Sequence, residues 1–238
     1  MSRRVPEFAL VTGGFLALTV LGVGVAFTGD LVRSALTAVV VGYPFGLYAV
    51  SHSEDPTEVL PPRYVLPAAA VAGASLLVAA VPGATERLAG RLLYALFVAL
   101  VVALPPAAYA VSYGRLRPLP PRATAAGGAV VGATLLVAGP LAGDAVIGAA
   151  DALLVFLAGV GYADVHGVGA TRRTRRLLVL AGGVFSLALV GVGLVVGSTT
   201  TLLPWVVAAI TAALGPSLHY ALSVEQGRRG QNFFNRRS

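Results

Sequence analysis

The stretch Pro44-Phe-Gly-Leu-Tyr48-Ala49-Val50-Ser51 stands where a long apolar run meets a charged segment, and its pattern returns twice. The other two copies are Pro105-Pro-Ala-Ala-Tyr109-Ala110-Val111-Ser112 and Pro216-Ser-Leu-His-Tyr220-Ala221-Leu222-Ser223. A weaker copy, Ala158-Gly-Val-Gly-Tyr162-Ala163, lacks the proline and the serine. Each copy ends an apolar run, so the motif divides the chain into segments of similar construction.

These apolar runs decide the fold class. Of 238 residues, 57% are hydrophobic and only 11% are charged, which is too little polar surface for a soluble domain. Runs of 18 to 21 apolar residues match the length that a helix needs to cross a bilayer. We therefore predict an all-α, polytopic membrane bundle of about eight transmembrane helices. The predicted spans are 8–27, 31–50, 64–81, 92–111, 123–141, 145–163, 177–196 and 202–222.

The arginines predict the orientation of the bundle. If the N-terminus is inside, fourteen of the seventeen arginines fall in inner segments and three in outer ones. This positive-inside bias predicts a cell-membrane protein with both termini in the cytoplasm. The first apolar run is longer than the core of a typical signal peptide, so we expect an uncleaved first span.

Every second span ends in the tyrosine motif, which predicts internal repetition. We expect a single transmembrane domain, 1–238, of four parallel two-helix hairpins at about 7–53, 63–113, 122–165 and 176–223. A basic cytoplasmic tail, 224–238, follows and suits an anionic membrane surface. Convergence is the alternative, because tyrosine favours membrane interfaces and proline often lies near helix ends.

The motif also has a physical interpretation. A proline inside a helix frees the carbonyl four residues earlier, and in a membrane that carbonyl needs another partner, such as a hydroxyl of a neighbouring helix. The expected helix bends are at Pro44, Pro105 and Pro216. The tyrosines form either a cytoplasmic cluster or four separate anchors that face lipid; they are Tyr48, Tyr109, Tyr162 and Tyr220.

Asp151 is the strongest candidate for a functional group inside the bilayer. It lies about two turns into the span 145–163, where insertion of a carboxylate costs about 2.5–3.5 kcal/mol. It needs a protein partner, a water-filled cavity or a proton, unless it lies near the outer interface. The three histidines, His52, His166 and His219, lie near span ends without ligand spacing, so we expect capping or exposure rather than metal binding.

Several function classes are disfavoured by the sequence. The chain has no cysteine, and all its basic residues apart from the histidines are arginine, which excludes thiolate sites and lysine Schiff bases. It carries no common hydrolase, zinc or phosphate-loop motif, so we expect no catalytic residue, no cofactor and no metal. The expected partners are the lipid bilayer and a membrane protein or a second copy, not nucleic acid. The interpretation is a structural or interaction subunit; the alternative is a small transporter or channel.

Overall fold

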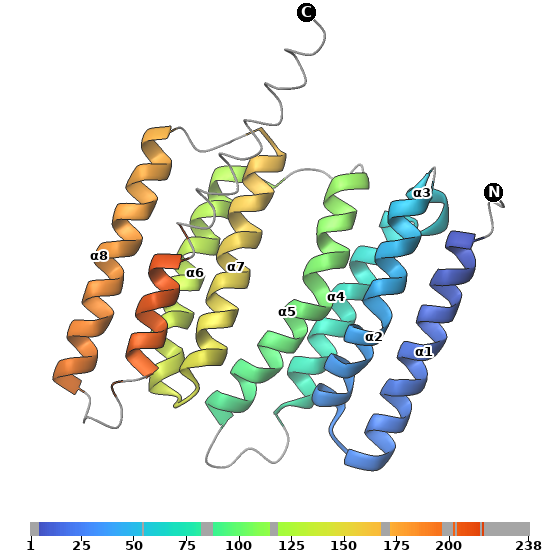
Figure 1. Cartoon of the computed structure of the whole chain (residues 1–238), viewed down its shortest axis with the longest axis horizontal. Helices are drawn as coiled ribbons and strands as arrows, with labels where there is room; N and C mark the ends of the chain where they lie inside the picture. The colour runs from blue at the N-terminus through green and yellow to red at the C-terminus, as the bar shows by residue number, and fades with distance from the viewer. Residues whose placement is uncertain are drawn as a thin grey trace, which may run out of the picture. The chain divides into compact units, whose positions relative to one another are not determined.

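A computed structural model describes residues 5–53, 55–81, 88–114, 119–167, 172–196, 202, 204–214 and 216. Throughout this described part the regular secondary structure is α-helical (Figure 1). The helices are α1 (Val5–Thr28), α2 (Leu31–His52), α3 (Pro56–Val59), α4 (Pro62–Ala79), α5 (Leu88–Tyr113), α6 (Pro121–Leu141), α7 (Ala145–Val165) and α8 (Arg172–Val196). A further apolar helix covers Pro204–Leu214.

Within the described residues, seven helices are long and apolar enough to span a membrane, namely all the labelled ones except α3. The prediction of a helical membrane bundle is therefore confirmed. The eighth predicted span, 202–222, is described mainly through Pro204–Leu214, and most of its remainder, with Tyr220 and His219, lies outside the described residues. The helix α3 was not predicted: it is a single turn in the first inner connection, opened by the cap of Asp55 and by Pro56.

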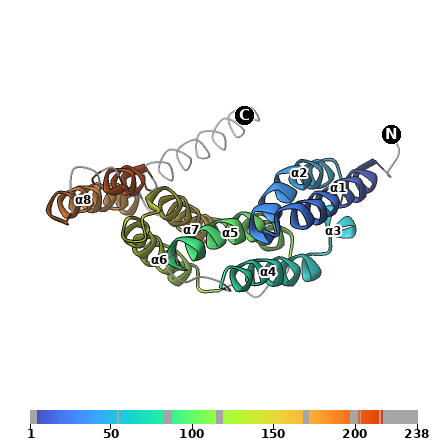
Figure 2. The same cartoon turned by 90° about the horizontal axis from the view of Figure 1, so that it is seen from below.

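The helices pack as sequence-adjacent pairs. The pairs α1–α2, α4–α5 and α6–α7 share the most contacts, and α8 packs against Pro204–Leu214. The chain divides into two compact units, Met1–Arg117 and Pro118–Ser238, here called the N-terminal and C-terminal units. Figure 2 shows α1 beside α2 in the first unit and α6 beside α7 in the second.

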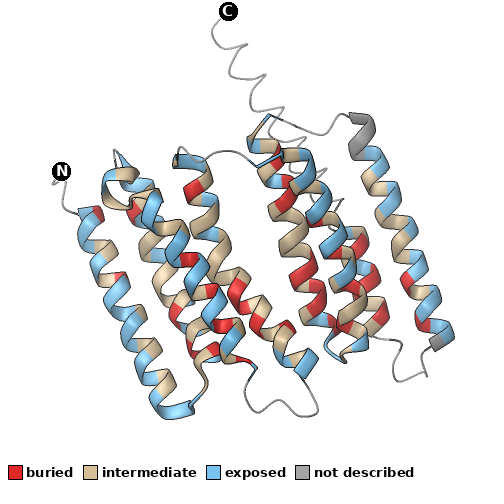
Figure 3. Ribbon diagram, turned by 180° about the vertical axis from the view of Figure 1, so that it is seen from behind, coloured by how far each residue is buried: buried red, intermediate tan, exposed pale blue. Residues whose placement is uncertain are grey.

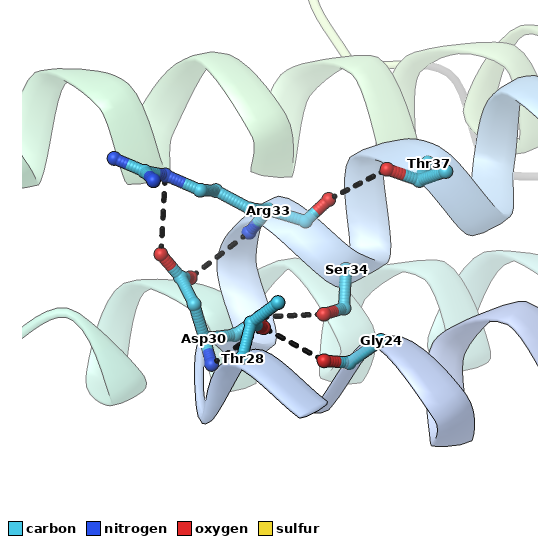
Figure 4. A network of polar contacts seen from close by, with 6 residues as sticks. All are labelled: Gly24, Thr28, Asp30, Arg33, Ser34 and Thr37. Atoms are coloured by element: carbon cyan, nitrogen blue, oxygen red, sulfur yellow. Dashed lines mark hydrogen bonds and ion pairs between the residues drawn. The ribbon is translucent and has the colours of Figure 1, made fainter. Parts of the chain in front are cut away.

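The hairpin turns have a common construction. Gly29 and Gly143 both have positive φ, 67° and 79°, and each is followed by an aspartate at the N-cap position of the next helix; of the two, the side chain of Asp30 makes a capping hydrogen bond. Figure 4 shows the first turn, where the Asp30 carboxylate accepts a hydrogen bond from the backbone N–H of Arg33 and forms an ion pair with its side chain. Ser34 donates its hydroxyl to the Asp30 carbonyl at 2.7 Å. These bonds satisfy backbone groups at the helix ends.

Small residues bring paired helices together at matching intervals. A side-chain carbon added at certain glycines would collide with the partner helix. Among the tight contacts are Gly13 with Phe45 and Gly24 with Ser34 in α1–α2, Gly128 with Gly159 and Gly139 with Gly148 in α6–α7, and Gly182 with Pro216 and Gly193 with Trp205 between α8 and its partner. Gly182 also lies close to the Ala212 carbonyl oxygen. On both helices of each hairpin the two contacts are eleven residues apart. Eleven residues are about three helical turns, so both contacts lie on one face.

Burial differs strongly between helices (Figure 3). Only 6% of an 18-residue apolar stretch of α1 is buried, whereas 39% of the equivalent stretch of α7 is buried. The N-terminal unit has a core around Ala95, Val98 and Ala99 of α5, and the C-terminal unit has one around Ala149, Ala152 and Trp205. The outer face of α1 consists of large apolar side chains, as expected of a helix in contact with lipid.

Candidate functional site

Two adjacent prolines in α5 free two backbone carbonyls, and a hydroxyl of another helix lies close to both. Pro105 and Pro106 lack N–H groups, which leaves the carbonyls of Val101 and Val102, four residues earlier, without their helical donors. The hydroxyl of Tyr43 in α2 lies 2.8 Å from both carbonyl oxygens. The expected hydroxyl from a neighbouring helix is therefore Tyr43, and it joins the two hairpins of the N-terminal unit.

The three motif prolines are found in helical backbone. Pro44 lies inside α2, Pro105 inside α5, and Pro216 has helical conformation beyond Pro204–Leu214. Figure 1 shows that α5 changes direction along its length. Pro216 packs close to Gly182 of α8, so it also contributes to helix contact. The role of these prolines as bends stays a prediction.

The Tyr109 hydroxyl binds the connection between α2 and α4, which precedes the α4–α5 hairpin. Its hydroxyl lies 2.8 Å from the carbonyl oxygen of Pro56 and 2.7 Å from that of Leu60. Both acceptors belong to α3 and the residue after it, immediately before α4 begins. Tyr109 is therefore not a simple lipid-facing anchor, because its hydroxyl closes the end of the α4–α5 hairpin.

Tyr162 makes the corresponding contact in the C-terminal unit. The backbone N–H of Leu119 donates to its hydroxyl at 2.7 Å. Leu119 precedes α6 by two residues, as Leu60 precedes α4. The two segments share a tetrapeptide, Leu60-Pro-Pro-Arg63 and Leu119-Pro-Pro-Arg122, and in both the helix begins at the second proline. This repeated tetrapeptide is the sequence signal from which the contact could have been predicted.

The motif tyrosines also stack on an aromatic ring one turn later. Tyr48 stacks on His52 and Tyr162 on His166, with 4.1 Å between ring centroids in each pair, and Tyr109 packs on Tyr113 at 4.9 Å. His52 and His166 also lie within hydrogen-bond distance of the carbonyls of their tyrosines, at 3.1 and 2.9 Å. His52 is the last residue of α2 and His166 is the C-cap of α7.

Asp55 is a solvent-exposed group with a shifted pKa. Hydrogen bonds from the side chain and then the backbone N–H of Thr57 hold the pKa of the Asp55 carboxyl below its usual range. The ionised form thus stabilises the α3 turn that Tyr109 contacts.

Asp151 is the most unusual polar residue of the described chain. It is the seventh residue of α7 and its side chain is fully buried, with 0% exposure. Neither carboxylate oxygen has a hydrogen-bond partner among the described residues. Protein thus encloses the carboxyl group about two turns into α7, and its depth in the bilayer stays a prediction.

The C-terminal unit also contains a recess of about 180 Å³. It lies between α6, α7, α8 and Pro204–Leu214, and Gly132, Phe156 and Phe185 contribute to its wall. Its lining is almost entirely apolar, and the hydroxyl of Thr211 is already bonded to the Val207 carbonyl at 3.0 Å. The recess is therefore suited to hydrocarbon and not to an ion.

The described residues hold no group of three or more His, Asp or Glu side chains that could bind a metal. Comparison with known protein families, with characterised proteins and with solved structures finds no match for this chain.

Proposed function

We propose that this chain is a structural or interaction subunit of the cell membrane, with both termini in the cytoplasm. Seven apolar helices support a multi-pass membrane protein. The distribution of the arginines supports this orientation and a tail, 224–238, at the inner surface. The described helices are joined by short connections, so the activity resides in the bundle and its ends.

This role is supported mainly by two helix faces, one on α1 and one on α8, whose glycines contact no other described helix. In α1, Gly14 and Gly22 have no neighbouring atom within 4 Å of an added Cβ, and Gly183 and Gly191 of α8 have none either. Leu18 and Leu187 lie between these glycines and are 70% and 74% exposed. Membrane helices associate through small residues that let backbones approach closely. These faces are therefore suited to helices of a second copy.

A fourfold hairpin architecture is part of the proposal. The eleven-residue interval between close contacts recurs in α1–α2, α6–α7 and α8 with its partner. The hairpin α4–α5 has buried alanines at the same interval, Ala69 in α4 and Ala80 at its C-cap. A shared interval, a shared turn and a shared tyrosine contact support repetition more strongly than convergence, because convergence would have to produce each one separately.

Replacing both Gly14 and Gly22 by isoleucine is expected to abolish self-association of the purified protein in detergent. The added side chains would hold the partner helix away from the α1 backbone. The measurement is the oligomeric state by light scattering or analytical ultracentrifugation.

Gly46→Ile in α2 is the matched control, because Gly46 also has open space around it but lies outside the α1 face. It is expected to leave association unchanged. A wild-type protein that is a monodisperse monomer and co-purifies with no partner would overturn the proposal.

A small transporter or channel is the second candidate, and Asp151 is the observation that favours it. A buried carboxyl group in a transmembrane helix is a common feature of ion and proton pathways. If wild-type protein in vesicles moves a solute, Asp151→Asn is expected to reduce that flux at least about tenfold, as loss of a required group does. Unchanged flux would remove Asp151 from the pathway, and the absence of flux for every solute class would remove the candidate.

A further inference from the structure

The depth and enclosure of Asp151 restrict what it can bind. It lies six residues after Ala145, the first residue of α7, which places it about 9 Å along the helix axis. Its side chain is fully enclosed, and both oxygens lack partners among the described residues. An enclosed carboxyl group with no room around it cannot accept a hydrated ion or an organic solute.

No described group of the C-terminal unit can neutralise the charge of an ionised Asp151. The other charged and titratable side chains that the structure describes in that unit are Arg122, Asp144, Tyr162, Asp164, His166 and Arg176. All of them lie near a helix end. Arg122 begins α6, the helix packed against α7, close to the Leu119–Tyr162 contact, which is about 16 Å from Asp151 along the axis.

The proposed hairpin repeat aligns Asp151 with an apolar residue of another hairpin. Asp151 precedes Tyr162 by eleven residues, and Val98 precedes Tyr109 by the same number. Val98 is also fully buried, in the middle of α5. An apolar side chain thus fills the corresponding position of another hairpin, whereas Asp151 brings in a polar group without a structural partner. A buried polar group that no neighbour satisfies weakens a fold and points to a role other than packing.

We propose that Asp151 is a proton-binding site within the membrane, which carries the neutral carboxylic acid at neutral pH. A proton is the one ligand that an enclosed, uncompensated carboxylate can take without further space. Binding converts the carboxylate and a proton from water into the acid, and release returns that proton to water. Because release leaves an unpaired charge in the apolar interior, it requires water to reach Asp151. Proton release is thus coupled to a local opening around α7. The inference goes beyond the scaffold role; only the comparison with Val98 rests on the proposed hairpin repeat.

Infrared difference spectroscopy tests the proposal on the full chain in lipid. The spectrum of wild type minus Asp151→Asn at neutral pH is expected to show the C=O stretch of a protonated carboxyl group, and this band is expected to be lost completely in the variant. Asp144→Asn is the control, because Asp144 caps α7 at its exposed end, and the band is expected to persist there. If the wild type minus Asp151→Asn difference contains carboxylate bands only, Asp151 is ionised and the proposal is wrong.

Transfer of the protein to heavy water tests whether Asp151 releases its proton to water. The band is expected to shift to lower frequency as deuterium replaces the proton, which requires contact with water. A band that never shifts would overturn binding and release, because the proton would then be permanently enclosed. Asp151→Val is the second variant, and Val98 shows that a valine fits the corresponding position. It is expected to fold and to lose the same band, so the result does not depend on the folding of Asp151→Asn.

Discussion

Gly148→Val is expected to lower the free energy of unfolding by about 1–3 kcal/mol, the usual cost of adding bulk to a filled interface. A Cβ on Gly148 would lie 2.5 Å from the Cα atom of Gly139 and 2.9 Å from the carbonyl oxygen of Leu135. These neighbours are backbone atoms and cannot rotate away. The α6 and α7 helices would therefore have to separate, and contacts along the whole interface would loosen.

Gly161→Val provides the control for this experiment. Gly161 belongs to the same helix, and no atom lies within 4 Å of an added Cβ. The same change in helix propensity and volume is expected to cost much less there. Loss of helical signal in denaturing detergent gives the stability of both variants. Equal destabilisation would show that valine acts on α7 itself and not on the contact with α6.

Tyr43→Phe is expected to destabilise the N-terminal unit by about 1–3 kcal/mol, because two partly buried carbonyl oxygens lose the hydroxyl donor that they share. The prolines of α5 prevent the helix from supplying one, and the Tyr43 hydroxyl is the described donor to Val101 and Val102. The ring stays in place, so the packing of α2 against α5 is preserved. The loss of stability therefore measures the contribution of the Tyr43 hydroxyl group alone.

The control for Tyr43→Phe is Tyr94→Phe, since the Tyr94 hydroxyl forms no hydrogen bond with the described residues and its ring also packs in this unit. It is expected to change stability little. A second comparison replaces Pro105 and Pro106 by alanine in the Tyr43→Phe background. Alanine restores the N–H donors of α5, so stability is expected to recover. If it falls further instead, the two carbonyls were not the cause of the loss.

Hydropathy was enough to locate most helices, because a span of apolar residues is a property of the local sequence. The bounds of α2, α6 and α7 differ from the predicted spans by only a few residues. The position of Asp151 could be predicted for the same reason, since one carboxylate within an apolar run is conspicuous. Its complete burial could not, because it depends on which residues pack around α7.

The polar contacts were the part that sequence reasoning missed. The freed carbonyls of α5 were predictable from its prolines, but Tyr43 is 58 residues from Val101, and no periodicity joins the two. The helix α3 was missed because a four-residue helix depends on its cap rather than on an apolar pattern. Tyr109 and Tyr162 were identified as important, yet their acceptors depend on where the chain enters each hairpin.

The contact between each tyrosine and the Leu-Pro-Pro segment also bears on how the protein enters a membrane. Tyr109 is 49 residues beyond Leu60, and Tyr162 is 43 residues beyond Leu119. Neither bond can form until the second helix of its hairpin has been synthesised. The first helix of each pair is therefore made without this hydrogen bond, and only a completed hairpin can form it.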